Sequence, residues 1–285
     1  MNVPPGRNTK GIALVFALFL VLVPTAGAAE SPQPSAQSSV ISQNPLVEQK
    51  VAGTLWLMSA EGRALSYQAF NVARMMFDQA LEENTKQEKL AVIVDIDDTI
   101  IDTSGYTVDI ILGLEASGEA WSNWIESQVA TPLPGSVEFL NYVVEKGADV
   151  YYVTNRLPDI REATLKSLAA LGFPQAEEGH LFIREEGMAS SKESRRQEVA
   201  KDHKIVLLMG DNLEDFSDLF APVSIKARAE AVDQAKALFG TKFIVLPNPM
   251  YGDWEKAIVE NRKNLTQEET KKMKIRALSE GKIEE

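Results

Sequence analysis

Four aspartates follow two short apolar runs of the sequence, at positions where a β-strand gains nothing from a charge. The runs are Leu90–Val94 and Ile205–Met209, and the aspartates are Asp95, Asp97, Asp211 and Asp215. Asp is depleted in strands, and neighbouring carboxylates repel each other unless a cation lies between them. Because Mg²⁺ prefers carboxylate oxygens, we expect these four side chains to form a magnesium site.

Two carboxylates one residue apart can divide the work of phosphoryl transfer. Asp95 would attack phosphorus, while Asp97 would protonate the departing oxygen and then activate water. Magnesium would bridge the nucleophile and a phosphate oxygen and offset the repulsion between the anions. The alternatives are structural: a strand-end aspartate often closes a turn, and Asp211 and Asp215 could cap the helix predicted there, after a tight turn at Gly210.

Side chains at other strand ends could bind phosphate. Thr154 and Asn155 follow the apolar run Asp149–Val153 and offer a hydroxyl, an amide and backbone N–H groups, which bind phosphate oxygens without neutralising a nucleophile. Lys192 would place a positive charge beside phosphate and Asp95. Each has a structural alternative, because Thr154 and Asn155 could cap the following helix and a single lysine is commonly a solvated surface residue.

From Lys89 onward, short apolar runs alternate with amphipathic helices, which is typical of an α/β fold with a parallel sheet covered on both faces. The predicted strands are Leu90–Val94, Asp149–Val153, Leu181–Ile183, Ile205–Met209 and Lys242–Leu246. The predicted helices are Gly135–Lys146, Pro158–Leu171, Lys192–Lys201 and Ala227–Phe239. Residues 103–131 are too many for a simple connection and predict an inserted lid. Since ligands of such sheets bind beyond the carboxyl ends of the strands, the polar residues there should gather into one site.

The N-terminal part of the chain has the composition of a targeting segment. Arg7 and Lys10 precede the apolar run Gly11–Val23, and small residues follow it, so residues 1–28 are expected to be a cleaved secretory signal. The protein would then be exported, to a bacterial periplasm, without a stable membrane anchor; an uncleaved anchor is the alternative. Residues 29–45 are polar and contain prolines, which predicts a flexible linker.

The folded part is expected to span residues 46–265. It would begin with a helical segment from Leu46 to Leu81, broken near Glu61-Gly62, because apolar residues recur there at intervals of three and four. Residues 266–285 predict a charged C-terminal helix, opened by the capping box Thr266-x-x-Glu269.

Composition excludes several kinds of chemistry. The 285 residues contain no cysteine, which excludes disulfides, zinc-thiolate sites, thiol nucleophiles and lipidation of an N-terminal cysteine. With 29 Lys and Arg against 41 Asp and Glu, the formal net charge is −12. This charge argues against a nucleic-acid partner, which needs a basic surface.

Two segments resemble the paired four-aspartate motifs of the class C nonspecific acid phosphatases, a family of the haloacid dehalogenase (HAD) superfamily. They are Val92-Ile93-Val94-Asp95-Ile96-Asp97-Asp98-Thr99 and Gly210-Asp211-Asn212-Leu213-Glu214-Asp215-Phe216. Further segments similar to the family, in the family's order, are residues 61–71, 134–139, 153–156, 191–196 and 246–255. The likeness covers residues 46 to 262. It implies an HAD-like Rossmannoid sheet with helices on both faces, a small lid insertion after the first strand and an added N-terminal helical segment.

The resemblance also implies roles for individual residues. It implies that Asp95 is the phosphorylated nucleophile and Asp97 the general acid/base. It also implies that Thr154 and Lys192 bind phosphate. Asp211 would be a direct magnesium ligand and Asp215 would support the metal shell. The backbone carbonyl of Asp97 and water would complete that shell.

Three features depart from the family pattern. Family members usually carry Glu where this chain has Asp98, and Asp-Ile-Asp-Asp-Thr is closer to the related class B enzymes. Many relatives are lipoproteins, which a chain without cysteine cannot be. Members that take nucleoside monophosphates resemble one another in an aromatic residue shortly before the first lid tryptophan, whereas residues 115–119, ahead of Trp121, contain none.

Aromatic residues remain as candidates for contact with the leaving group. Tyr106, Trp121 and Tyr251 are the predicted substrate-binding residues, and Tyr251 is the best placed of them to stack on a nucleobase or a nicotinamide ring. Trp124 and Trp254 are expected in the core.

The sequence therefore predicts a magnesium-dependent acid phosphatase that hydrolyses small phosphomonoesters, including 5′-nucleotides, through a phosphoaspartate. One alternative is a non-catalytic exported protein that uses the same fold for binding or adhesion. The other is a phosphotransferase that passes the phosphoryl group to an alcohol. Family likeness also implies a homodimer.

Overall fold

The computed structural model describes residues 45–221 and 224–280. The predicted signal peptide, and the predicted linker except for Pro45, lie outside the described residues. Within the described ranges, none of the helices combines the length and the apolar character needed to cross a membrane.

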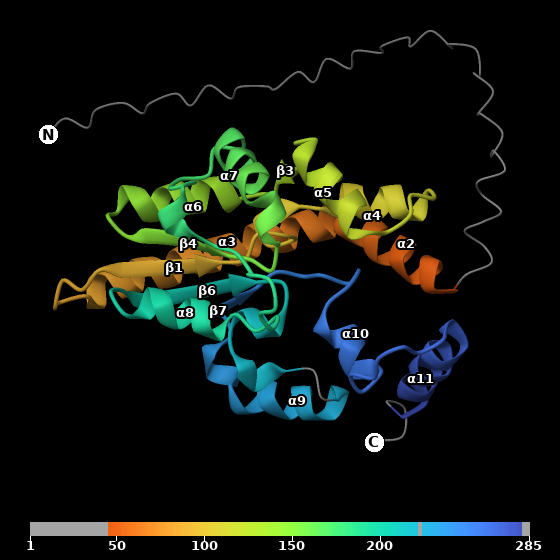
Figure 1. The fold of residues 1–285 in the computed structure, drawn as a ribbon. Helices are drawn as coiled ribbons and strands as arrows, with labels where there is room; N and C mark the ends of the chain where they lie inside the picture. Colours follow the sequence, from red (N-terminus) through yellow and green to blue (C-terminus); the bar gives the residue numbers. More distant parts are fainter. Residues whose placement is uncertain (1–44, 222–223, 281–285) are drawn as a thin grey trace, which may run out of the picture. The chain divides into compact units, whose positions relative to one another are not determined.

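Five parallel strands form the central sheet, in the order β5-β4-β1-β6-β7 (Figure 1). The strands are β1 Leu90–Val94, β4 Asp149–Val153, β5 Leu181–Phe182, β6 Lys204–Gly210 and β7 Phe243–Val245. The predicted α/β fold with a parallel sheet is confirmed. Two strands have the predicted bounds, β5 and β7 are shorter, and β6 is one residue longer at each end. Because β1 pairs with β4 on one side and with β6 on the other, the residues that follow these three strands emerge side by side.

Helices cover both faces of the sheet (Figure 1). One face packs against α3 Ala60–Glu83, α6 Ser136–Glu145 and α7 Arg161–Ala170, and the other against α8 Glu193–Ala200 and α9 Ile225–Gln234. Alternate residues of β1 contribute to the two cores, with Val92 and Val94 on the α3 side and Ala91 and Ile93 on the other. Every residue of β1 is buried, as a central parallel strand requires.

The N-terminal helical segment breaks slightly earlier than predicted. Helix α2 spans Pro45–Leu57, and α3 begins at Ala60 after Ser59, whose Oγ accepts a hydrogen bond from Gly62 N. A Cβ atom on Gly62 would lie 2.5 Å from the Leu57 carbonyl oxygen. Gly62 therefore permits the close approach of α3 to the Leu57 carbonyl oxygen. The break between the two helices lies at Ser59, which caps α3.

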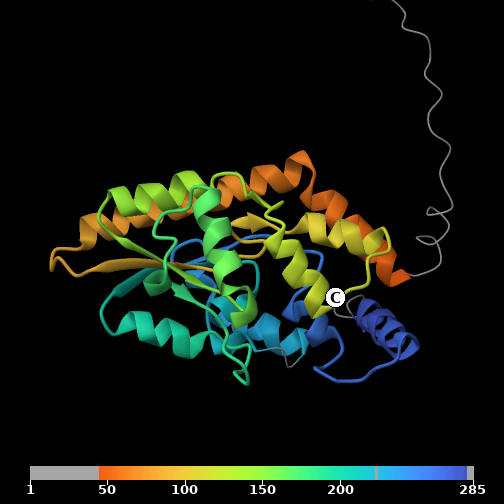
Figure 2. The same cartoon turned by 45° about the horizontal axis from the view of Figure 1, so that its top comes forward.

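The predicted lid forms two short helices and a strand pair. Helix α4 spans Ser104–Ile111 and α5 spans Gly118–Glu126, between the paired strands β2 Ile101–Asp102 and β3 Thr131–Pro132. Helix α4 packs against α2, and α5 packs against α7 (Figure 2). The insertion is thus anchored to the body of the fold at both of its helices.

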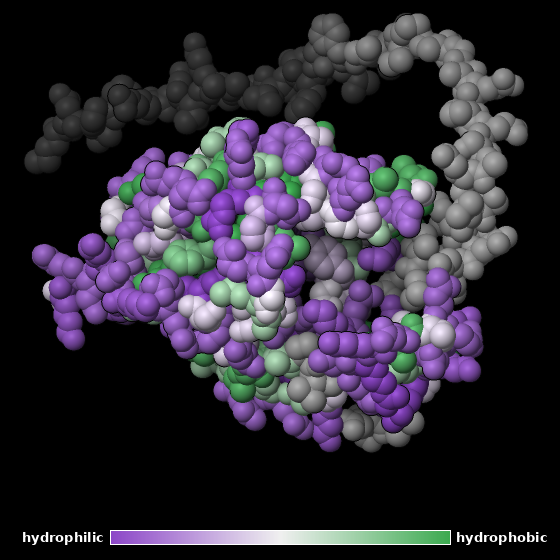
Figure 3. Space-filling view, viewed as in Figure 1, coloured by the Kyte–Doolittle hydropathy of each residue, from purple (hydrophilic) through white to green (hydrophobic). Residues whose placement is uncertain are grey.

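The C-terminal part contributes α10 Asp253–Ile258 and α11 Gln267–Glu280. The capping box is present, because Thr266 N donates to Glu269 Oε2 (2.8 Å) and Glu269 N donates to Thr266 Oγ1 (3.3 Å). Most of the face seen in Figure 3 is hydrophilic.

Candidate active site

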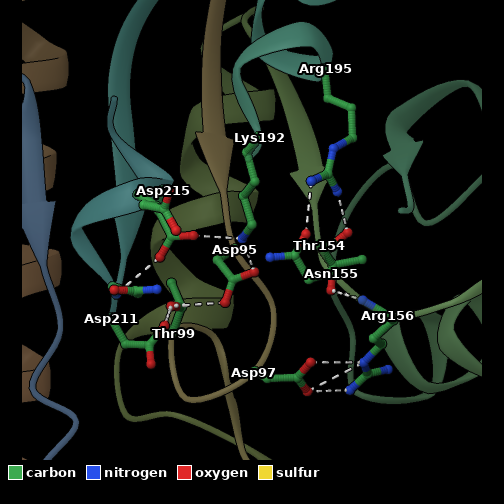
Figure 4. Close-up of polar contacts among 12 residues, drawn as sticks. Asp95, Asp97, Thr99, Thr154, Asn155, Arg156, Lys192, Arg195, Asp211 and Asp215 are labelled. Atoms are coloured by element: carbon green, nitrogen blue, oxygen red, sulfur yellow. Dashed lines mark hydrogen bonds and ion pairs between the residues drawn. The ribbon is translucent and has the colours of Figure 1, made fainter. Parts of the chain in front are cut away.

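Lys192 and three aspartates converge at the carboxyl ends of β1 and β6 (Figure 4). Asp95 follows β1, and Asp211 and Asp215 follow β6. The ammonium group of Lys192, just before α8, forms ion pairs with Asp95 Oδ1 and, at 2.6 Å, with Asp215 Oδ1. Lys192 is 3% exposed, so it is a buried ion-pair partner and not the solvated surface lysine that its sequence alone allows.

The three carboxylates lie close enough to share one cation. One oxygen from each of Asp95, Asp211 and Asp215 lies within 4.8 Å of the other two. Thr99 Oγ1 bridges the group, at 3.5 Å from Asp95 Oδ2 and 3.4 Å from Asp211 Oδ1. Asn248 Nδ2 donates to Asp211 Oδ2 at 2.7 Å and fixes that carboxylate from the loop after β7.

The charges of this cluster do not balance among its own residues. Burial raises the pKa of Asp95 to about 7 against the lowering effect of Lys192, and Asp215 and Asp97 raise it further. Burial, followed by the charges of Asp215 and Asp95, raises the pKa of Asp211 well above its ordinary value. When ionised, three carboxylates beside one ammonium leave two negative charges in excess. A divalent cation with oxygen ligands fits both the charge and the donor set.

The turn after β6 explains how Asp215 reaches this point. Residues Leu213–Asp215 form a 3₁₀ turn where the sequence predicted the start of a helix. Asp215 Oδ2 accepts a hydrogen bond from Asn212 N at 3.0 Å, so the residue also caps the turn. A Cβ atom at Gly210 would lie 2.2 Å from Asp215 Oδ2. Gly210 is therefore needed because Asp215 packs directly over it. A left-handed backbone is not the reason, because the φ angle of Gly210 is not positive.

Asp97 points away from the carboxylate cluster and pairs with Arg156 (Figure 4), so its side chain does not join the other three aspartates as the sequence predicted. Arg156 Nη2 lies 2.7 Å from Asp97 Oδ1, and Nε lies 3.1 Å from Oδ2, which is a bidentate contact. Arg156 Nη1 donates to Thr164 Oγ1 at 3.1 Å, and its guanidinium lies 5.8 Å from the Trp121 ring. The arginine is buried, so the orientation of the Asp97 carboxylate is fixed by a rigid partner.

A second arginine holds the loop after β4. Arg195 Nη1 donates to the Thr154 carbonyl oxygen, and Arg195 Nη2 donates to Asn155 Oδ1 at 2.8 Å (Figure 4). With its oxygen engaged by Arg195, Asn155 keeps its amide NH₂ group available to the pocket that it lines. Thr154 is buried, and its Oγ1 accepts a hydrogen bond from Arg156 N at 3.2 Å. Neither residue caps the helix that follows, because Leu157 stands at that position.

A pocket of about 560 Å³ is bordered by most of the polar residues described above: Asp95, Asp97, Asn155, Arg156, Lys192, Asp211 and Asp215, but not Thr154. It is lined by the catalytic candidates and, farther out, by residues from α2, the lid and α10. Of the three predicted substrate-binding aromatics, Tyr106 and Trp121 lie edge to face with 4.9 Å between ring centroids. The third, Tyr251, lines the same pocket. Trp124 is 9% exposed and packs beneath the first two rings, which agrees with a core position.

Asp98 links the loop after β1 to Tyr251 and to the lid. Its Oδ2 accepts hydrogen bonds from Tyr251 Oη (2.5 Å) and Thr103 Oγ1 (2.7 Å), and its Oδ1 accepts one from Thr103 N (3.0 Å). Burial raises the pKa of Asp98 to about 6, although the tyrosine and threonine bonds oppose the shift. The φ angle of Asp98 is +54°, a conformation that Asp tolerates better than most residues. The hydroxyl of Tyr251 is therefore occupied, and its ring is the part left to face a ligand.

Sequence reasoning did not single out three residues that the structure brings into the site: Arg156, Arg195 and Asn248. Two of them carried a usable signal. Arg156 directly follows the predicted phosphate-binding pair. Arg195 stands three positions after Lys192, which places Lys192 and Arg195 on the same side of a helix start. Asn248 gave no comparable signal, because its partner is 37 residues away.

Comparison with known proteins agrees with this geometry. Residues 28–254 match the family described as HAD superfamily, subfamily IIIB (Acid phosphatase). The chain belongs to this family. It is therefore a phosphomonoesterase of the acid phosphatase type, and the family that its motifs predicted is confirmed.

Two solved structures are similar over most of the chain. The class C acid phosphatase from Bacillus anthracis is 38% identical, with a TM-score of 0.75, and the match covers 80% of this chain and 96% of that one. The same enzyme with tungstate bound gives a TM-score of 0.76 at the same identity and coverage. Vegetative storage protein 1 from Arabidopsis thaliana is 29% identical over 131 residues, 43% of this chain, and the match spans 47% of that protein's length.

Proposed function

We propose that this phosphatase is magnesium-dependent and works through a phosphoaspartate on Asp95. The observation that carries the proposal is the cluster of Asp95, Asp211 and Asp215 around the buried Lys192 at the ends of β1 and β6. Asp95 is the carboxylate directly after the central strand β1, and it lines the pocket. Attack by one of its oxygens on phosphorus forms the phosphoaspartate and releases the alcohol.

The cation would be held by this chain's own oxygens. Asp95, Asp211 and the backbone carbonyl of Asp97 would be its ligands, and Asp215 would support them. When bound, Mg²⁺ offsets the negative charge of the carboxylates and of the phosphoryl oxygens, which is the chemistry that the residues alone do not supply. Asn248 orients Asp211, and the Asn212 backbone amide orients Asp215.

Asp97 would be the general acid and base. Its carboxyl group would give a proton to the leaving oxygen and then take one from the water that hydrolyses the phosphoaspartate. Arg156 holds this carboxylate in one orientation through two hydrogen bonds. Such positioning supports proton transfer, because the transfer depends on geometry before it depends on acidity.

Phosphate oxygens would be bound by Lys192, Asn155 and the hydroxyl of Thr154, because the Thr154 N–H already donates to the Phe182 carbonyl oxygen. Lys192 already contacts the nucleophile, so it would lie beside the transferred group. The Asn155 amide faces the pocket because Arg195 holds its oxygen. Tungstate, which is bound in one similar structure, is a tetrahedral oxyanion like phosphate, and this supports an oxyanion site in the fold.

Small phosphomonoesters are the expected substrates, with 5′-nucleotides among them. Tyr106, Trp121 and Tyr251 line the pocket and offer aromatic faces to a leaving group. Two further properties belong to the same proposal: export to a periplasm and assembly as a homodimer.

The test is hydrolysis of a chromogenic phosphate ester by the parent protein and by Asp95→Asn, with Mg²⁺ and with chelator. We expect hydrolysis only by the parent with Mg²⁺, while circular dichroism shows that the variant is folded. Full activity in Asp95→Asn, or activity that is indifferent to chelation, would overturn the proposal. Equal, negligible rates in both proteins would favour a non-catalytic role, which the name of the similar storage protein makes worth testing.

A further inference from the structure

Four basic residues line the pocket, and they differ in whether a carboxylate neutralises them. They are Lys50, Arg156, Lys192 and Lys256. The last three are paired: Arg156 with Asp97 at 2.7 Å, Lys192 with Asp215 at 2.6 Å, and Lys256 with Asp253 at 2.6 Å.

Lys50 is the exception. Among the described residues, no hydrogen bond or ion pair involves its ammonium group. Its carbonyl oxygen accepts a hydrogen bond from Thr54 within α2. The side chain is half-buried, so part of its hydration shell is replaced by the pocket wall. A half-buried cation without a partner gains more from an incoming anion than a fully solvated one does.

Acidic residues near the mouth of the pocket have other partners. Asp253 Oδ2 accepts a hydrogen bond from Asn212 Nδ2 at 2.6 Å, and Asp253 Oδ1 pairs with Lys256. Glu255 lies 3.2 Å from the Lys274 ammonium. These interactions engage both carboxylates, and Lys50 lines the same pocket in a chain whose formal net charge is −12.

The position of Lys50 in the fold assigns it to the leaving-group end. The phosphate-binding groups lie at the ends of the sheet strands, whereas Lys50 belongs to α2, which runs beside the lid helix α4 (Figures 1 and 2). Tyr106 and Ile110 of that helix line the same pocket. An ester that fills the pocket outward from Asp95 therefore meets aromatic and apolar surface together with one unneutralised ammonium group.

We propose that Lys50 binds a second anionic group on the substrate, so that the preferred substrates are phosphomonoesters whose leaving group carries a carboxylate or another phosphate. This inference rests on the proposed phosphatase chemistry for the first phosphate. A carboxylate and a second phosphate share the same chemistry here: each offers an anionic oxygen that can pair with the Lys50 ammonium group.

The test compares two pairs of esters whose members differ in the second anionic group. The first pair is 3-phosphoglycerate and glycerol 3-phosphate, and the second is propane-1,3-diol bisphosphate and its monophosphate. For each pair, the ratio of kcat/KM is measured in the full-length parent, in Lys50→Met and in Lys50→Arg. The matched control is Lys86→Met, which removes the same charge from an exposed lysine before β1, at the opposite ends of the strands.

We expect the parent to favour the member with the second anionic group by about fivefold, the scale of a partly solvated ion pair. Lys50→Met should reduce the ratio to near one, while Lys50→Arg and Lys86→Met keep it. A preference in the first pair alone would identify a carboxylate as the second group, and one in the second pair alone a phosphate. A ratio near one in both pairs for the parent, or a ratio that Lys50→Met leaves unchanged, would overturn the inference.

Failure of the proposed catalysis can be told apart from failure of this subsite. The dissociation constants of the same four esters are measured by calorimetry on Asp95→Asn and on the double variant with Lys50→Met, with Mg²⁺ present. A protein that hydrolyses none of the esters refutes the proposed mechanism, yet the ratio of dissociation constants still decides the role of Lys50. An equal affinity for the esters with and without the second anionic group refutes the subsite by itself.

Discussion

Gly210→Ala tests whether the site depends on the close packing of Asp215 over the end of β6. A Cβ atom at this position would lie 2.2 Å from Asp215 Oδ2 and 2.4 Å from Asp215 Cβ. To restore ordinary van der Waals contact, Asp215 must move by about 1 Å. That movement strains its hydrogen bond with Asn212 N and its ion pair with Lys192.

The size of the effect follows from these contacts. Forcing a methyl group into a packed position costs about 1–3 kcal/mol. For a chain of this length each kcal/mol lowers Tm by about 2–4 °C, so a cost of about 1–3 kcal/mol gives an expected fall of roughly 2–12 °C. Catalysis should suffer more, because displacing a positioning group by about 1 Å can cost on the order of 10²-fold in rate.

The assay combines thermal unfolding, a Mg²⁺ titration and kcat for one phosphate ester. Gly179→Ala is the matched control, since Gly179 has no neighbouring atom within 4 Å of an added Cβ and its φ is not positive. We expect the control to resemble the parent in all three measurements. If Gly210→Ala keeps its Mg²⁺ affinity and kcat within about twofold of the control, the packing of Asp215 does not set the geometry of the site.

Three further predictions concern charged groups. Arg156→Met leaves Asp97 without its bidentate partner, so kcat should fall about tenfold or more at unchanged Mg²⁺ affinity, and an unchanged kcat would contradict the positioning role. Arg195→Met should raise the inhibition constant of inorganic phosphate about tenfold. In a protein that already carries Asn155→Ala, the same substitution should leave this constant unchanged. Equal effects in both backgrounds would show that Arg195 does not act through Asn155. Burial raises the pKa of Asp95 to about 7 from 3.8, so in metal-free protein Asp95 costs no stability below about pH 4, and its cost grows as pH rises from there to about 7. In chelator, the Tm of Asp95→Asn should therefore rise relative to that of the parent between about pH 4 and pH 8, and a Tm difference that stays constant over this range would contradict this sign.

The parts of the fold that the sequence predicts well are those with a strong local pattern. The strand Leu90–Val94 is apolar at every position because both faces are buried, and Asp95 marks its end. The helix break near Gly62 was misplaced, because the glycine is required by a tertiary approach to Leu57 and the break itself depends on the cap at Ser59. A local sequence pattern does not distinguish a glycine that breaks a helix from a glycine inside a helix that permits close packing.

The site was predictable to the extent that its residues follow strand ends. The carboxylates were found for this reason, and their convergence with Lys192 follows from the parallel order of β1 and β6. The contacts that orient them were harder to predict. Asn248 meets Asp211 from 37 positions away, and Tyr251 meets Asp98 from 153 positions away, so the pairing is a product of the tertiary fold and leaves no periodic trace in the sequence.

The central claim is that Asp95 becomes phosphorylated, and mass spectrometry of the acid-quenched protein tests it most directly. The protein is mixed with a phosphate ester and Mg²⁺, quenched within the first turnover and digested. We predict a phosphoryl group on the peptide that contains Asp95, absent when chelator replaces Mg²⁺. Rapid hydrolysis with the phosphoryl group on a different residue, or with none bound at any time, would contradict the account.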